Sequence, residues 1–317
     1  MYSNILIIGA SGQIGSELCQ RLRDEKDEGE VVASDIREAS DEVMQGGPFE
    51  ILDATDADQL EEVVYHYGID EIYLMAAMLS GTAETFPMKA WNLNMNTLFN
   101  VLNLAKEMKI NKVFWPSSIA VFGPNTPKDN TPQNTIMDPS SVYGISKLTG
   151  ERWCEYYHNR YNVDVRSIRY PGLISYSTPP GGGTTDFSIE LYDYAIKNKA
   201  YTSFIEKDTF LPMMYINDAI EATIQIMRAD AENLNIRSSY NLGGISLSPE
   251  MIIDSIQKHQ PVKVDYKPDF RQKIADSWPS KIDDSVAQKD WNWKHQYQLD
   301  DITQAMLKGF QEKIKAD

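Results

Sequence analysis

The sequence contains few cysteines, few histidines and no long hydrophobic run. Its 317 residues include two cysteines, Cys19 and Cys154, which form no C-x-x-C motif and no cluster with histidine. We therefore expect no disulfide framework and no metal site. The apolar run Ile5–Ile8 is too short for a signal peptide, and no run reaches the length of a transmembrane span. These absences predict a cytoplasmic protein.

Basic residues are also scarce relative to acidic ones. The chain has 30 Lys and Arg against 46 Asp and Glu, which gives a formal net charge of −16. Nucleic acids and anionic membranes are bound through basic stripes, and the sequence has none. We therefore exclude both as partners and attribute the acidity to solubility. An apolar fraction of 42% with well-mixed charge is typical of an ordinary globular protein rather than a disordered one.

Short β-rich runs alternate with helical patterns through the first half of the chain. The expected strands are Ile5–Ile8, Val31–Asp35, Phe49–Asp53, Glu71–Ala76, Val113–Trp115 and Val165–Tyr170. The expected helices between them are Gln13–Arg23, Asp58–Tyr67, Ala90–Lys109 and Ser141–Tyr161. This alternation predicts right-handed βαβ crossovers, and hence an α/β Rossmann fold with a doubly wound parallel sheet.

The alternation stops after Tyr170, and Thr178–Thr185 has the composition of a loop. We expect residues 1–174 to form the nucleotide-binding Rossmann domain. A return to its sheet is expected near residues 209–243, through Met213–Tyr215 and Tyr240–Leu242. Residues 175–208 and 244–317 are expected to form a smaller mixed α/β lobe that binds the substrate.

A glycine pattern, Gly9-Ala-Ser-Gly12-Gln-Ile-Gly15, follows the first strand directly and opens the first helix. Glycines at these positions permit a tight turn and a close approach of the backbone to a pyrophosphate at the positive end of the helix. The alternative is a glycine-rich turn without a ligand. Because a strand precedes the pattern and a helix follows it, we favour a dinucleotide site.

Carboxylates at the ends of two strands bear on the choice of dinucleotide. Asp35 ends the second strand, twenty residues after Gly15, where it can accept the ribose hydroxyls of NAD and repel the extra phosphate of NADP. Arg37 could hold that phosphate, but the repulsion by Asp35 is direct, so we favour NAD. Asp53 is either a partner for the adenine amino group or a loop carboxylate.

Tyr143 and Lys147 lie four residues apart in an expected helix, so their side chains leave the same face. A phenol and an ammonium held together can act as one acid–base unit, and the cation is expected to lower the pKa of the tyrosine. Alone, the pair could simply be one face of a helix. The dinucleotide fingerprint earlier in the chain favours the catalytic interpretation.

Several motifs together resemble the extended short-chain dehydrogenase/reductases. They are the Gly9–Gly15 fingerprint, Ser117–Gly123, Tyr143-x-x-x-Lys147, Asn94–Leu102, Met214–Ala219 and Tyr240–Gly243. The match runs from about Ile5 to Leu242. Two positions depart from the family pattern: Phe122 replaces a tyrosine, and Thr97 stands where glycine is common. Neither position need contact the substrate.

Within this family the chain is most similar to the short-chain type of L-threonine 3-dehydrogenases. The segments that carry this similarity are Gly181–Phe187, Asp208–Tyr215, Ala275–Pro279 and Asp290–Trp293. Sugar-nucleotide epimerases of the family tend to have an asparagine-containing segment where this chain has Arg169–Ile174. The small lobe also shows no basic cluster suited to a diphosphate.

The resemblance implies oxidation of L-threonine at its β-hydroxyl to 2-amino-3-oxobutyrate, a step of threonine catabolism. In that scheme Tyr143 is the general base, Lys147 and Ser118 assist it, and Asn94 supports the lysine through a water. NAD would be held by Gly9, Ser11, Gly12, Gln13, Ile14, Gly15, Asp35, Ile36, Arg37, Asp53, Ala54, Leu74, Ala76, Ala77, Asn94, Ser117, Tyr143, Lys147, Tyr170, Pro171, Gly172 and Ile174. The substrate would meet Ser80, Gly81, Ser118, Tyr143, Thr184, Thr185, Asp186 and Trp278.

Some of these roles have structural alternatives. Ser118 could instead cap a short turn, Asp186 could cap a helix rather than meet the substrate ammonium, and Trp278 could pack inside the small lobe. The alternative functions are a sugar-nucleotide epimerase or reductase and a non-catalytic regulator that binds dinucleotide. The resemblance also implies a homodimer in which Ala90–Lys109 and Ser141–Tyr161 pair across a two-fold axis.

Overall fold

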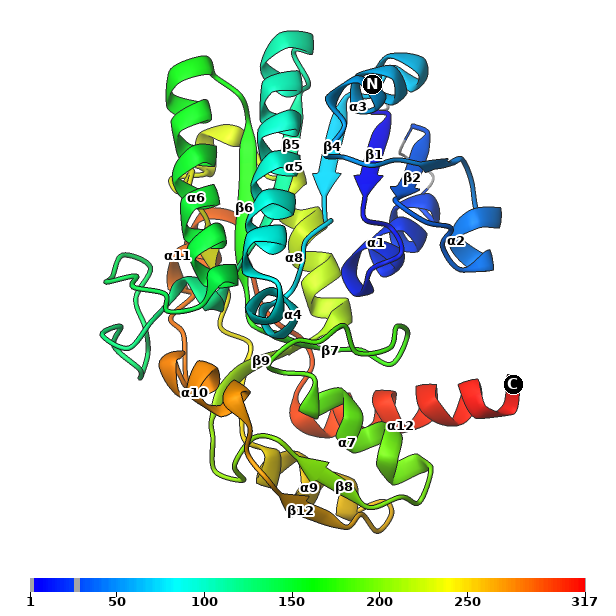
Figure 1. Ribbon diagram of the computed structural model, residues 1–317, viewed down its shortest axis with the longest axis vertical. Coiled ribbons are helices and arrows are strands. Elements are labelled where there is room, and N and C mark those ends of the chain that lie inside the picture. Colours follow the sequence, from blue (N-terminus) through cyan, green and yellow to red (C-terminus); the bar gives the residue numbers. More distant parts are fainter. Residues whose placement is uncertain (1–2, 26–28, 317) are drawn as a thin grey trace.

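The computed structural model describes residues 3–25 and 29–316, and a seven-stranded parallel sheet forms its larger half (Figure 1). The strand order is β10-β6-β5-β4-β1-β2-β3. The strands are β1 Ile5–Ile8, β2 Val31–Asp35, β3 Phe49–Ile51, β4 Glu71–Leu74, β5 Lys112–Ser118, β6 Val165–Tyr170 and β10 Tyr240–Asn241. The predicted doubly wound Rossmann sheet is therefore confirmed.

Helices cover both faces of this sheet. They are α1 Gln13–Arg23, α2 Asp41–Gln45, α3 Ala57–Tyr67, α4 Ser80–Thr85, α5 Pro87–Met108, α6 Val142–Tyr161 and α8 Ile216–Arg228. Alternate residues of β1 enter different cores: Ile5 and Ile7 join the cluster that includes α1 and α8, whereas Leu6 and Ile8 join the one beneath α3, α5 and α6. A strand buried on both faces requires the continuous apolar run seen in the sequence.

Some strand boundaries differ from the expected ones. β3 ends at Ile51 and β4 at Leu74, two residues earlier than predicted in each case. After Leu74 the chain turns, since the amides of Met75 and Ala76 both donate to the carbonyl of Ile8. β5 is longer than expected, because its pairing with β6 continues to Ser118 opposite Tyr170.

The smaller half contains two short sheets and five helices among the described residues. A three-stranded sheet has the order β11-β9-β7, and a two-stranded sheet pairs β12 with β8. Its strands are β7 Gly172–Ile174, β8 Tyr201–Ser203, β9 Leu211–Tyr215, β11 Ile245–Leu247 and β12 Val264–Tyr266. Its helices are α7 Phe187–Ile196, α9 Pro249–Gln257, α10 Phe270–Ser277, α11 Ser285–Trp291 and α12 Leu299–Ala316.

One of the two expected returns to the main sheet is wrong. Tyr240 does pair with β6, opposite Ile168. Met213–Tyr215 instead lies in the three-stranded sheet, where β9 runs parallel to β7. Pro171, which has no amide hydrogen, separates β6 from β7, so the chain leaves the main sheet there and gives β9 a different partner. The helix α8, which follows β9, packs against β5 and β6 of the main sheet.

Within residues 3–25 and 29–316, no helix is both long enough and apolar enough to cross a membrane. Cys19 and Cys154 are buried in α1 and α6 as free thiols.

Candidate active site

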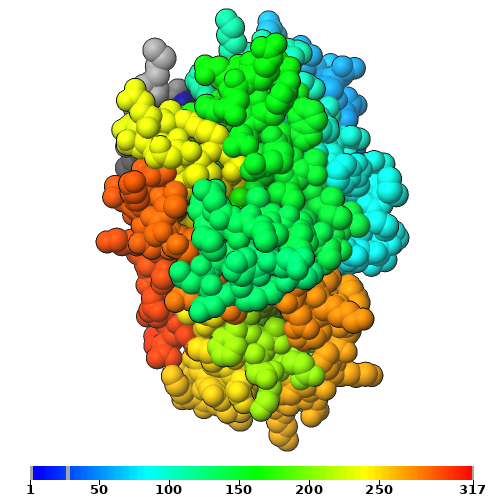
Figure 2. Space-filling view, turned by 90° about the vertical axis from the view of Figure 1, so that its left-hand side faces the viewer, coloured from blue at the N-terminus to red at the C-terminus, as the bar shows by residue number. Residues whose placement is uncertain are grey.

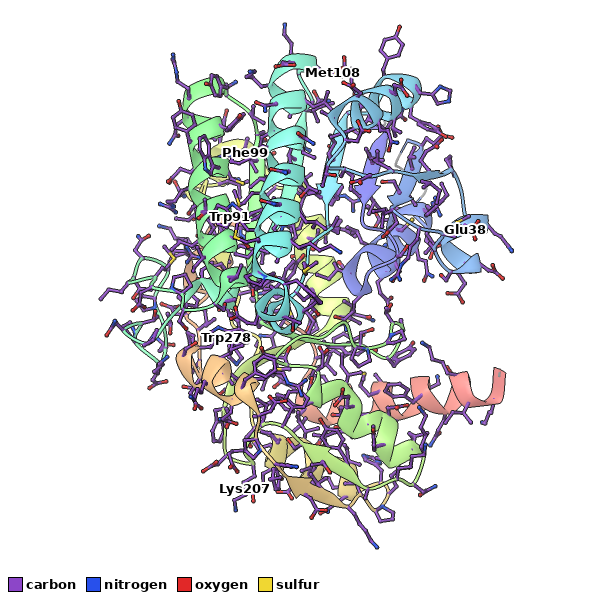
Figure 3. The ribbon with its side chains drawn as sticks, viewed as in Figure 1. Glu38, Trp91, Phe99, Met108, Lys207 and Trp278 are labelled. Carbon is purple, nitrogen blue, oxygen red and sulfur yellow. The ribbon has the colours of Figure 1, made fainter. Side chains whose placement is uncertain are left out.

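A pocket opens at the carboxyl ends of the main-sheet strands, where the two halves of the molecule meet. From the larger half it is lined by Gln13, Ile14, Ala77, Ser80, Ser117, Ser118, Tyr143, Lys147 and Tyr170. From the smaller half it is lined by Pro171, Gly172, Thr184, Thr185, Asp186 and Trp278. Figure 3 shows Trp278 at the junction between these halves. Open α/β sheets bind ligands at this edge.

In the glycine fingerprint, a side chain at Gly9 or Gly15 would clash with neighbouring backbone atoms. Gly9 has a positive φ of 93°, and a Cβ there would lie 2.6 Å from the amide nitrogen of Ala76. A Cβ on Gly15 would lie 2.1 Å from the carbonyl oxygen of Gly9. The backbone of β1 therefore passes unusually close to β4 and to the start of α1, as the pyrophosphate interpretation requires.

The neighbouring donors also suit a phosphate. The N-cap residue of α1 is Gly12, so no side chain caps the amides at the start of this helix. The first turn of α1 also carries no acidic residue. The hydroxyl of Ser11 is buried without a hydrogen-bond partner among the described residues. A buried donor left unpaired beside free helix amides fits a bound anion, and this is the pyrophosphate position of the predicted cofactor.

Asp35 already takes part in shaping this site. One carboxylate oxygen accepts a hydrogen bond of 3.0 Å from the amide of Ser11, and the other accepts one of 2.8 Å from the amide of Ile36. The side chain of Ile36 is largely exposed, as a surface for an adenine ring would be. Arg37 instead lines a second cleft with Ser11, outside the central pocket.

Asp53 has the loop role that was considered as its alternative. Its Oδ1 accepts hydrogen bonds from the amide and the hydroxyl of Thr55, at 2.9 and 2.7 Å. These bonds form a turn between β3 and α3. The carboxylate is therefore engaged in the protein itself, although Ala54 and Leu74 lie on the same edge of the sheet.

The proposed catalytic residues converge from β5 and α6. Ser141 caps α6 by accepting a hydrogen bond of 3.1 Å from the amide of Gly144, which fixes the start of the helix beside β5. The hydroxyl of Tyr143 is hydrogen-bonded to Ser118. Ser118 also accepts a bond of 3.2 Å from the amide of Ala120 and so caps the short turn η1, Ile119–Val121. Its structural role and its contact with the tyrosine thus coexist.

The pKa of Tyr143 is raised in the protein, whereas a lowering beside Lys147 was expected. Burial raises the pKa of Tyr143 to about 12, and the hydrogen bond from Ser118 lowers it only in part. Burial also lowers the pKa of Lys147 to about 7. The lysine Nζ donates to the carbonyl of Pro116 at 2.5 Å and lies 4.5 Å from the ring centre of Trp115. Desolvation is therefore the largest influence on the pKa of each of these two groups.

Asn94 supports the turn after β4. Its Oδ1 accepts a hydrogen bond of 2.8 Å from the amide of Met78. Its Nδ2 donates to the carbonyl of Met78 and to the hydroxyl of Ser146, both at 3.3 Å. Asn94 of α5 is thereby linked both to the turn that leads to Ser80 and to α6. Its partner in α6, Ser146, is the residue before Lys147.

Residues predicted to meet the substrate come from both halves and are hydrogen-bonded across the junction. The hydroxyls of Ser80 and Thr184 lie 3.1 Å apart, and the amide of Gly81 donates to the carbonyl of Gly182 at 3.0 Å. Asp186 is the N-cap residue of α7 but makes no side-chain bond to that helix. Its Oδ2 instead accepts bonds of 2.8 Å from the amides of Gly182 and Gly183.

The carboxyl group of Asp186 lines the pocket and has a shifted pKa. Burial raises its pKa to about 6, against the lowering effect of the two glycine amides. Its Oδ2 serves the loop, while Oδ1 accepts no hydrogen bond that we find among the described residues. A buried carboxylate with one free oxygen facing a pocket can accept a cationic group.

Sequence reasoning missed part of this pocket. Met75, Leu79, Pro116, Ile119, Leu173 and Gly183 also line it. Each lies next to a predicted residue, either at a strand end or in a loop that leads to α4 or α7. It also missed Glu151, which is fully buried four residues after Lys147 and bonded to Ser117 and Arg169. The spacing of four after Lys147 was the available signal.

No group of three or more His, Cys, Asp or Glu side chains within the described ranges could hold a metal ion. The polar side chains that line the pocket include hydroxyls, two phenols, one ammonium and one carboxylate. A hydroxyl substrate and a dinucleotide are the ligands that this set accommodates.

A family model described as the NAD dependent epimerase/dehydratase family matches residues 5–243. Among curated proteins, an uncharacterized epimerase/dehydratase of Staphylococcus saprophyticus is 48% identical over 316 residues, covering 99% of this chain and 98% of that protein.

Solved structures of high similarity are L-threonine dehydrogenases. The holo form of a GalE-like enzyme from Cupriavidus necator is 50% identical with a TM-score of 0.93, covering 96% of this chain and 99% of that one. An enzyme from Clostridium difficile is 48% identical with a TM-score of 0.94, covering 99% of each chain. A monomeric L-threonine 3-dehydrogenase from a metagenome is 41% identical with a TM-score of 0.94, covering 98% and 99%.

Proposed function

This chain belongs to the NAD dependent epimerase/dehydratase family, and we propose that it is an NAD-dependent L-threonine 3-dehydrogenase. It would oxidise the β-hydroxyl of L-threonine to give 2-amino-3-oxobutyrate, a step of threonine catabolism. The observation that carries the proposal is the pocket in which Ser118, Tyr143 and Lys147 face Thr184 and Asp186. Its support is the similarity of the whole chain to enzymes with this activity, at 50% and 48% identity.

The lining of the pocket favours a small zwitterion over a sugar nucleotide. Among the described residues that line it, Lys147 is the one cationic side chain. A diphosphate needs several cations or a helix N-terminus free for it, whereas an amino-acid carboxylate can be held by hydroxyls and amides. Ser80 and Thr184 offer the hydroxyls, and Asp186 offers a carboxylate for the ammonium group.

The protein's residues would divide the work as follows. NAD, when bound, accepts the hydride from the substrate carbon. Tyr143 takes the proton of the β-hydroxyl, which Ser118 orients through the hydrogen bond that it shares with the tyrosine. Lys147, held by Pro116, stands close enough to hold the nicotinamide ribose and to stabilise the phenolate of Tyr143 before it takes the proton. The Gly9–Gly15 turn and Asp35 hold the rest of the cofactor.

The proposal includes a homodimer formed through α5 and α6. Their outer face carries large exposed side chains, among them Trp153 at 37% and Tyr156 at 47% exposure. Trp153 also packs edge-on against Phe99 of α5, so aromatic side chains of both helices meet on this face. Aromatic surfaces of this kind are common at protein interfaces.

Assays of threonine oxidation, of UDP-galactose epimerisation and of NADH binding together distinguish the candidate functions. With NAD and L-threonine, the NADH band is expected to rise with time. Turnover of UDP-galactose without a response to threonine would favour the epimerase. Binding of NADH without turnover of either substrate would favour the regulator, and both of those outcomes contradict the proposal.

The affinity for threonine should depend on the protonation of Asp186. Its pKa is raised to about 6, so the carboxylate is ionised above that value and neutral below it. A neutral acid loses its attraction for an ammonium group. We therefore expect KM for threonine to rise as the pH falls from about 7 to about 5, by tenfold or more when the acid is fully protonated.

An Asp186→Asn variant should have a high KM that no longer changes over this range, while its amide oxygen still accepts the glycine amides. Asp193→Asn, on the same helix with its carboxylate paired to Lys197, is the matched control. Identical pH profiles for Asp186→Asn and the unchanged protein would exclude Asp186 as the ammonium partner.

A further inference from the structure

The loop Gly123–Pro139, here called the strap, links the two catalytic elements. It begins after η1, which Ser118 caps, and ends before α6, which carries Tyr143. In Figure 1 it projects from the side of the molecule below α6. Figure 2 shows its surface seated between α6 and the segment near α10 of the smaller half. The strap thus touches both halves next to the pocket.

Backbone hydrogen bonds attach the strap to residues 277–283. The carbonyl of Lys128 accepts the amides of Ser280 and Lys281, at 2.9 and 3.3 Å. Thr131 donates to the carbonyl of Lys281 and accepts from the amide of Asp283, both at 3.0 Å. Thr131 and Ile282 accordingly form a parallel bridge. This contact fixes the strap beside the segment that follows Trp278.

The ammonium of Lys128 contacts the residue immediately before Trp278. Its Nζ donates to the carbonyl of Gly123, at 3.2 Å, and to the carbonyl of Ser277. The carboxylates of Asp138 and Asp276 lie close enough to raise its pKa, although burial lowers it by more. Two carbonyls and two carboxylates therefore surround the ammonium of Lys128 and stabilise its positive charge.

We propose that Lys128 is a positioning residue for the substrate pocket, joining the strap to the carbonyl of Ser277 and so fixing Trp278 relative to Ser118 and Tyr143. This inference rests on the proposed function, since it treats the pocket as the threonine site. Lys128 does not line the pocket, and its proposed effect is to fix the position of Trp278, which does.

Trp278 depends on such a restraint because no strand holds it. It is the C-cap residue of α10, and its extended backbone, with φ of −91° and ψ of 160°, leaves the helix at that point. Its amide donates to the carbonyl of Ala275 at 3.0 Å, and its indole is 7% exposed. Lys128 donates to the carbonyl of Ser277, the residue immediately before Trp278. Removal of the ammonium should therefore loosen the backbone that positions the indole at the pocket.

The test compares Lys128→Met with Lys281→Met. Methionine retains the apolar stem of the lysine and removes its charge. Lys281 is exposed in the same segment and joins the strap through its backbone alone, so its variant matches the change in charge. For Lys128→Met we expect KM for threonine to rise about tenfold or more, with a smaller change in kcat and an unchanged affinity for NADH. Lys281→Met should change neither constant.

Two further measurements keep the inference falsifiable. In Lys128→Ala, propylammonium, which replaces the missing part of the side chain, should restore KM with saturation, while a neutral propyl alcohol should not. Hydrogen exchange in the peptide 277–283 should be faster in Lys128→Met than in the unchanged protein and should slow again when the amine is added to Lys128→Ala. The exchange measurement does not require threonine as the substrate, so it still tests the inference if the proposed function fails. Equal KM values and equal exchange for Lys128→Met and Lys281→Met would overturn it.

Discussion

Replacement of Tyr143 by phenylalanine is expected to lower kcat for threonine by about 10²–10⁴-fold. The phenolate form of Tyr143 can take the proton of a substrate hydroxyl, and its oxygen is hydrogen-bonded to Ser118 in the pocket. Phenylalanine retains the ring, which packs against the larger core cluster, and so should leave the fold and the cofactor site unchanged. Steady-state turnover with NAD and threonine gives kcat, and NADH fluorescence gives the binding constant.

The pH dependence adds a second signature of the same role. Because the pKa of Tyr143 is raised to about 12, the free protein holds the phenol almost wholly protonated at neutral pH. The fraction of phenolate, and with it the rate of the unchanged enzyme, should therefore rise as the pH is raised. This rise should be absent in Tyr143→Phe. Tyr65→Phe, at a position 79% exposed, should behave as the unchanged enzyme. Retention of most of the turnover by Tyr143→Phe would refute the role of the phenol.

Local sequence patterns predicted the elements whose cause is local. The run Ile5–Ile8 had to be a strand buried on both faces, and the glycines after it had to form a tight turn. The placement of Met213–Tyr215 could not be read in this way. Its β-rich composition predicts a strand, but the choice between two sheets depends on where Pro171 ends β6, and that is decided by tertiary pairing.

The site shows the same division between local and tertiary causes. The spacing of Tyr143 and Lys147 follows from the helix period, so their shared face was predictable. Their pKa values follow from burial by β5 and the smaller half, which a sequence does not display. Asp186 is similar: its position before α7 suggested a cap, but the loop folds back so that its carboxylate binds two glycine amides instead.

Glu151 forms a buried ion pair behind the catalytic helix face. Its side chain is 0% exposed, and Arg169 donates to both of its oxygens at 2.8 Å. Ser117, the neighbour of Ser118, donates to the same carboxylate at 2.6 Å. The pair therefore joins α6, β5 and β6 at the level of the pocket. Its loss should affect stability more than any single contact on the surface.

A Glu151→Ala variant is expected to lower the free energy of unfolding by about 3–5 kcal/mol, because it leaves the guanidinium of Arg169 buried without its charge partner. Urea denaturation followed by circular dichroism measures this loss. Glu155→Ala removes a partly exposed carboxylate paired with Arg152 one turn further along α6, and should change stability by about 0–1 kcal/mol. The double variant Glu151→Leu with Arg169→Met removes both charges, so it should be less destabilised than the sum of the two single variants. If Glu151→Ala and Glu155→Ala lose equal stability, or if the two single losses simply add, the buried pair does not hold these elements together.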